Sequence, residues 1–71
     1  MQEVFIKTEF IKLGQALKLA GLVGSGTDAK FIIGDGLVSV DGETETRRGR
    51  KLFGGEVVTF EDNSFKIINN G

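Results

Sequence analysis

The apolar residues of this chain change their spacing at Gly36, and that change constrains the fold more than any other feature. Between Leu13 and Ala20 they recur three and four residues apart, which is typical of a helix with one buried face. After Gly36, Val38 and Val40 alternate with polar residues, which is typical of a strand with one buried face. The sequence therefore predicts helices followed by strands.

Two helices are predicted in the first half of the chain. The first covers about 12–20 and ends at Gly21, because glycine commonly follows the last residue of a helix. The second covers about 27–34, with Ser25 as a good N-cap residue. The segment before them, residues 2–6, is expected to form a short strand or an ordered arm.

The second half predicts a small, mostly antiparallel sheet. Asp41-Gly42 is a strong hairpin-turn signal, with strands expected on either side at 38–40 and 43–46. The remaining expected elements are a turn at 53–55, a strand at 56–60, a turn at 62–64, a strand at 65–68 and a frayed tail at 69–71. The predicted fold class is α+β, with two N-terminal helices packed on this sheet.

The chain is long enough for a single domain, expected to span 1–71. It has no cysteine, so disulfides and thiolate metal sites are excluded and apolar packing must hold the fold together. With a hydrophobic fraction of 39% and six phenylalanines, a folded core is expected, and most of the phenylalanines should lie in it.

The composition argues against an enzyme. Histidine is absent, so the commonest general base at neutral pH is missing, and no cofactor is implied. An enzyme would have to use carboxylates, lysine or hydroxyls, and the spacing of Asp41, Glu43 and Glu45 matches no catalytic arrangement. The same carboxylates alternate along the predicted hairpin and offer oxygen ligands for a metal ion, but a polar outer face of the hairpin is the favoured interpretation.

The N-terminal residues do not follow a charged-then-apolar signal pattern, so we expect a cytoplasmic protein. No apolar run approaches the roughly 18 residues that a membrane helix needs, so no membrane partner is expected.

A basic run is the strongest local signal for a ligand. Arg47, Arg48, Arg50 and Lys51 fall within five positions, broken by Gly49. Guanidinium groups bind phosphate oxygens bidentately, so the run suits RNA or another polyanion. The run alone fits an alternative equally well: a solvated loop that binds no ligand and whose cations pair with the nearby glutamates Glu43 and Glu45.

Other polar residues depend on how the helices pack. Free backbone amides at the Gly24–Thr27 helix start could accept a phosphate, although an ordinary capped helix start is favoured for this segment alone. Phe53 adjoins the basic run and could stack on a base, although a core position is favoured for it. The polar residues of the helix surfaces become relevant only if they converge with the arginines; they are Lys12, Gln15, Lys18 and Lys30.

Three segments together resemble a known family. They are Leu13–Lys18 (LGQALK), Ser25–Lys30 (SGTDAK) and Ile33–Gly42 (IGDGLVSVDG), and they follow the alpha-L RNA-binding motif, the domain named after small-subunit ribosomal protein S-four. The resemblance covers about 12–60. The stretches LGQALKLAGLVGSGTDAK, VSVDGETETRRGRKL and GGEVV are similar to a short, stand-alone bacterial subgroup typified by the YaaA and YbcJ proteins.

This resemblance implies an L-shaped pair of helices on the sheet and non-catalytic binding of structured RNA, usually ribosomal or transfer RNA. The residues that it implies for RNA contact are Lys12, Gln15, Lys18, Ser25, Gly26, Thr27 and Lys30 on the helices, and Arg47, Arg48, Arg50 and Lys51 in the loop. The chain departs from the family at Gly26, where an arginine is usual, and at Gly14, where an aspartate is usual. The missing arginine implies weaker binding of RNA or a narrower range of RNA targets. It also implies that the 47–51 loop contributes more of the binding.

The sequence thus predicts a monomer that recognises folded RNA largely by shape, with ribosomal RNA or an assembling ribosomal particle as the expected partner. The rival hypothesis is a protein-interaction module that adds a partner strand at a sheet edge of the 56–68 hairpin.

Overall fold

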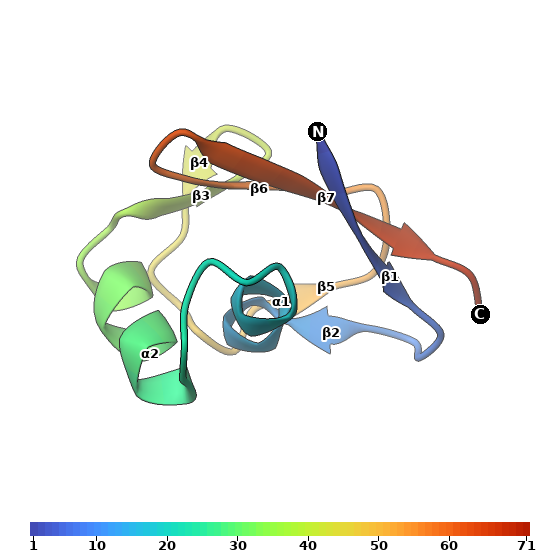
Figure 1. Cartoon of the computed structure of the whole chain (residues 1–71), viewed down its shortest axis with the longest axis horizontal. Helices are drawn as coiled ribbons and strands as arrows, with labels where there is room; N and C mark the ends of the chain where they lie inside the picture. The colour runs from blue at the N-terminus through green and yellow to red at the C-terminus, as the bar shows by residue number, and fades with distance from the viewer.

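A five-stranded sheet covers two helices in the computed structural model, which describes residues 1–71 (Figure 1). The strands are β1 (Gln2–Ile6), β2 (Ile11–Lys12), β3 (Val38–Val40), β4 (Glu43–Thr44), β5 (Lys51–Leu52), β6 (Val57–Phe60) and β7 (Asn63–Asn69), and the helices are α1 (Leu13–Leu19) and α2 (Gly26–Gly34). The strand order is β1-β7-β6-β3-β4, and β2 pairs with β5 in a second sheet. The α+β class is confirmed, but the helices are not N-terminal, because β1 and β2 precede them.

The first and last strands of the chain lie side by side. β1 and β7 run parallel, with Val4 opposite Ile67, whereas the other neighbours in the large sheet are antiparallel. Of the two alternatives expected for residues 2–6, a short strand or an ordered arm, the strand is the one observed, and its partner lies at the far end of the chain. As a result both strands of the β6–β7 hairpin have neighbours on each side, so the hairpin offers no free edge for strand addition, and that detail of the rival hypothesis is wrong. The free edges belong to β1 and β4.

Helix α1 follows the predicted apolar spacing and buries Leu13, Ala16 and Leu17. It ends as predicted at Gly21, whose φ of 78° lies in the left-handed region that glycine adopts without strain. The amide of Leu22 then donates to the Leu17 carbonyl at 3.1 Å, which satisfies the last turn of the helix.

Helix α2 begins after Ser25, whose hydroxyl accepts a hydrogen bond from the Asp28 amide at 3.2 Å, so the predicted N-cap is confirmed. Ala29 and Ile33 face the core, while Phe31 points outward. In Figure 1, α1 is seen nearly along its axis and α2 more from the side, so the two axes are inclined to each other.

The Asp41-Gly42 turn forms as predicted, with φ angles of 51° and 85° that match a type I′ hairpin. The return strand is shorter than expected and ends at Thr44, although the amide of the buried Glu45 still donates to the Val38 carbonyl at 2.9 Å. The last hairpin turns at Glu61-Asp62 rather than at 62–64, since Asn63 already pairs with Phe60.

The core is one cluster of 15 buried apolar residues from both helices and both sheets. Phe65 is the only phenylalanine among them. The expectation that most phenylalanines are buried is therefore wrong; Phe5, Phe31 and Phe53 are each half exposed or more. No helix is long and apolar enough to cross a membrane.

The tail is held in place rather than frayed. Asn69 belongs to β7, and its side-chain amide donates to the carbonyls of Thr8 at 3.1 Å and Phe53 at 2.9 Å. The next amide, that of Asn70, donates to the Ile6 carbonyl at 2.8 Å. These bonds join the end of the chain to the turn that follows β1.

Candidate nucleic-acid interface

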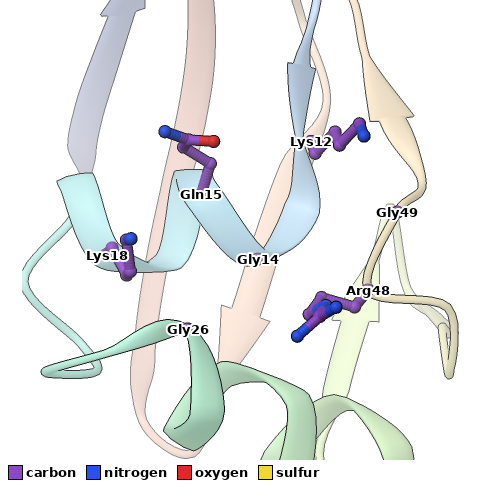
Figure 2. A pocket seen from close by; sticks show the side chains of 7 residues that line it. All are labelled: Lys12, Gly14, Gln15, Lys18, Gly26, Arg48 and Gly49. Atoms are coloured by element: carbon purple, nitrogen blue, oxygen red, sulfur yellow. The ribbon is translucent and has the colours of Figure 1, made fainter.

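An open cavity of about 260 Å³ lies where the start of α1, the start of α2 and the loop before β5 meet (Figure 2). None of its lining residues is apolar or acidic; they are Lys12, Gly14, Gln15, Lys18, Gly26, Arg48 and Gly49. Three of these side chains are cations, so the cavity favours an anion with several oxygen atoms, such as a phosphate group. We call it the basic cavity.

Helix geometry places one side of the basic cavity. Lys12, Gln15 and Lys18 stand three residues apart and therefore share one face of the α1 region. Burial of the opposite face turns this face outward. Figure 2 shows Gln15 and Lys18 along α1, with Lys12 on the strand that leads into the helix.

Backbone hydrogen bonds hold the loop that forms the other side of the basic cavity. The amides of Leu13 and Gly14 donate to the carbonyls of Arg50 and Arg48, at 2.8 and 3.1 Å. The first turn of α1 therefore uses the loop as its cap, and no side chain caps it. This docking brings Arg48 and Gly49 beside α1 and opposite Gly26, as Figure 2 shows.

Two of the four loop cations are held elsewhere, by Glu45. This buried carboxylate accepts hydrogen bonds from Arg47 Nε at 3.0 Å, Arg47 Nη2 at 3.1 Å, the Arg47 amide at 3.0 Å and Arg50 Nη1 at 3.1 Å. The Arg47 side chain, followed by its amide and Arg50, lowers the pKa of Glu45 from 4.5 to about 2, although burial opposes the shift. The pairing of loop cations with a nearby glutamate is thus confirmed for Arg47 and Arg50 with Glu45, while Glu43 pairs with neither.

The fourth loop cation contacts an aromatic ring. Lys51 Nζ lies 4.7 Å from the centre of the Phe10 ring, a cation–π geometry. Phe10 in turn packs at a tilt against Phe53, with 6.0 Å between the ring centres. Phe53 is 50% exposed, so the favoured core position is wrong, and stacking of a base on its ring stays a prediction.

The structure brings together five of the residues predicted for RNA contact: Lys12, Gln15, Lys18, Gly26 and Arg48. It leaves six outside the basic cavity: Ser25, Thr27, Lys30, Arg47, Arg50 and Lys51. Among these, Ser25 uses its hydroxyl as the helix cap. All but Arg50 are exposed, so their contact with RNA stays a prediction.

Sequence reasoning did not assign Gly14 and Gly49 to the site. Glycine within a helix costs about 1 kcal/mol relative to alanine, so its presence usually has a packing reason. Gly14 sits in the second position of α1 and is buried. That position was the available signal that another group lies against the helix there.

Two of the three carboxylates considered for catalysis or a metal, Asp41 and Glu45, have other contacts. Asp41 Oδ1 accepts a hydrogen bond from the Val57 amide at 2.9 Å, and Glu45 is bound to two arginines. Nowhere in the chain do three or more potential metal ligands come together.

Comparison with known proteins identifies the family to which the chain belongs. A family model described as the S4 domain matches residues 4–68. The chain belongs to the S4 domain family. The resemblance found in the sequence is thereby confirmed, and the basic cavity is a feature of this S4 domain.

Similar proteins match the S4 domain over nearly its whole length. "Probable ribosome maturation protein RlbA" of Bacillus subtilis (strain 168) is 46% identical over 67 residues, covering 93% of this chain and 94% of that protein. "Putative RNA-binding protein YbcJ" of Escherichia coli (strain K12) is 39% identical over 62 residues, covering 87% of this chain and 89% of that protein. The solution structure of Escherichia coli YbcJ, described as revealing an alpha-L motif involved in RNA binding, matches with a TM-score of 0.74 at 36% identity, covering 96% of this chain and 87% of that one.

Proposed function

We propose that this protein binds structured RNA through the basic cavity and catalyses no reaction on it. The observation that carries the proposal is the convergence of Lys12, Lys18 and Arg48 on one cavity without an acidic residue. The chain has a net charge of −1, so this local concentration of positive charge is not a result of overall composition.

The binding mode follows from the side chains. Arg48 offers a planar pair of donors to two phosphate oxygens, while Lys12 and Lys18 act as point charges on the neighbouring phosphates. Gly26 opens α2 without a side chain, which lets a phosphate approach the start of the helix. Because backbone bonds already fix the loop against α1, less conformational entropy is lost when RNA binds.

The proposed target is ribosomal RNA or an assembling ribosomal particle, bound by a monomer in the cytoplasm. The name of the Bacillus subtilis relative, a probable ribosome maturation protein, supports the ribosomal target. Phosphate contacts carry no sequence information, so the shape of the surface formed by α1 and α2 would select the RNA. Exposed neighbours of the cavity, including Thr27 and Lys30, would extend the contact.

The test measures binding to ribosomal RNA and to ribosomal subunits across a series of salt concentrations. The variants are Lys12→Ala, Lys18→Ala and Arg48→Ala, singly and combined, because each side chain is exposed and outside the core. Each phosphate contact contributes about 0.7 to 0.9 to the slope of log affinity against log salt, so the combined variant should flatten it by roughly two to three units.

The matched control is Lys66→Ala. Lys66 is exposed on β7 and lines no cavity, and its substitution by alanine removes the same charge as Lys18→Ala. It should leave the slope nearly unchanged. If Lys66→Ala weakens binding as much as Lys18→Ala does, the attraction is diffuse and the basic cavity is not the site. If the wild type binds no RNA at low salt, the proposal fails, and protein partners of the free β1 or β4 edge become the next hypothesis.

A further inference from the structure

A second hollow, the apolar groove, adjoins the basic cavity. It measures about 500 Å³, within the range of sites that hold small organic groups. Its apolar lining comes from Phe5, Ile6, Phe10, Ile11 and Leu19. Lys12 and Gln15 line both hollows, so the two share a wall and a ligand can occupy them together.

Two of the apolar side chains that line the groove are largely exposed. Phe5 on β1 is 57% exposed and Leu19 on α1 is 60% exposed, so neither contributes much to the core. Grouped apolar exposure of this kind marks a binding surface more often than scattered residues do. Phe10 completes the group, and its ring is contacted by Lys51 and by Phe53.

The charges around the groove indicate the chemistry of its occupant. Lys7 and Lys12 line it and no acidic residue does, so an anionic partner is favoured. Gln15 adds an amide that can both donate and accept at the boundary with the basic cavity. A flat aromatic group joined to phosphates satisfies all of these features, and an unpaired nucleotide is such a group.

We propose that an unpaired nucleobase of the bound RNA enters the apolar groove and stacks on Phe5. Its own phosphate stays with Lys12, at the wall shared with the basic cavity. This inference rests on the proposed function and sharpens it, because it makes the preferred target a bulge or junction rather than a continuous duplex. Base–aromatic stacking of this kind should change affinity on the order of tenfold.

The experiment compares three RNA hairpins of one sequence. The first has a single-nucleotide purine bulge, the second has an abasic residue at the bulge, and the third is fully paired. The purine is 2-aminopurine, whose fluorescence falls on stacking and is read without background because the chain has no tryptophan or tyrosine. The protein variants are Phe5→Ala and, as a matched control, Phe31→Ala, which removes a 62% exposed phenylalanine on α2 outside both hollows.

We expect the wild type and Phe31→Ala to bind the purine bulge about tenfold more tightly than the abasic hairpin, and to quench 2-aminopurine. Phe5→Ala should lose the preference and the quenching, while its affinity for the abasic hairpin stays as in the wild type. A Leu19→Ala variant should act in the same direction, which guards against a local effect on β1 alone.

The results separate the two proposals. If the wild type binds all three hairpins equally with the expected salt dependence, the nucleobase proposal is overturned and phosphate binding stands. If Phe5→Ala keeps the preference, the base binds elsewhere and the groove assignment is wrong. If no hairpin binds and no ribosomal RNA binds either, both proposals fail together.

Discussion

The side chain of Arg48 lies directly against the backbone of Gly14. A Cβ atom at position 14 would stand 2.7 Å from Arg48 Cγ and 3.3 Å from Arg48 Cδ, closer than carbon atoms approach without displacement. The absence of a side chain at Gly14 therefore lets the stem of Arg48 cross α1 and carry the guanidinium group into the basic cavity. Gly14 is in this sense a positioning residue for Arg48.

Gly14→Ala should weaken RNA binding by about tenfold, or ~1.4 kcal/mol, because Arg48 must leave its place. Stability should change little, since alanine gains up to about 1 kcal/mol of helix propensity that offsets the crowding. A double-mutant cycle with Arg48→Ala, read by RNA titration, checks the coupling. If the effects of the two substitutions on the free energy of RNA binding are additive, they act separately and Gly14 does not position Arg48.

Glu45→Gln should destabilise the fold by roughly 1–3 kcal/mol near neutral pH, because charge-assisted hydrogen bonds to Arg47 and Arg50 are weakened. Urea unfolding at pH 7 measures the loss. The loop should also loosen, so the first amides of α1 should exchange hydrogen faster. An unchanged free energy of unfolding would mean that the hydrogen bonds of Glu45 to Arg47 and Arg50 do not stabilise the loop.

The same carboxylate predicts a pH dependence. Its folded-state pKa of about 2 lies below the ordinary 4.5, so the stability it contributes is fully present above pH 4.5 and is lost as the pH falls toward 2. The wild type should therefore lose more stability across this window than Glu45→Gln does. Equal losses in the two proteins would assign the acid sensitivity to other groups.

Ser25→Ala should destabilise the protein by about 1 kcal/mol through loss of the α2 N-cap. Ser25→Asp should keep the cap, since aspartate is also a good N-cap residue, but it places a negative charge next to Gly26 of the basic cavity. Thermal unfolding and RNA titration together distinguish the roles. Weaker RNA binding by fully folded Ser25→Ala would show that the hydroxyl itself contacts RNA.

Asn69→Ala should cost about 1 kcal/mol, because its side chain bridges the carbonyls of Thr8 and Phe53. The turn after β1 and the Phe53 corner should then separate more easily. Hydrogen exchange at the Asn70 amide, which is bonded to Ile6, should report the change before the core unfolds. Unchanged exchange at Asn70 would indicate that backbone pairing alone holds the tail.

Local signals predicted the fold where neighbouring residues determine it. The Leu13–Ala20 spacing, the Ser25 cap and the Asp41-Gly42 turn each act within one element, and the structure confirms all three. The β1–β7 pairing joins opposite ends of the chain and leaves no local pattern. The exposed phenylalanines could not be predicted either, because composition gives the number of apolar residues and not the face on which each lies.

The candidate site was predictable in chemistry but less so in geometry. Lys12, Gln15 and Lys18 share a helix face, so their convergence follows from spacing. The four loop cations looked equivalent in sequence, yet only Arg48 lines the basic cavity. Their separation depends on where Glu45 turns inward, which is a consequence of packing across the whole core.

The parallel pairing of β1 with β7 also affects how the chain folds as it leaves the ribosome. β1 is synthesised first, yet its only partner in the large sheet is synthesised last. While the chain grows, the backbone groups of β1 that later pair with β7 have no partner, so the large sheet cannot be completed until β7 has been synthesised. Emergence of β7, rather than emergence of the helices, therefore sets the moment at which the turn after β1 and the groove beside it take their final form.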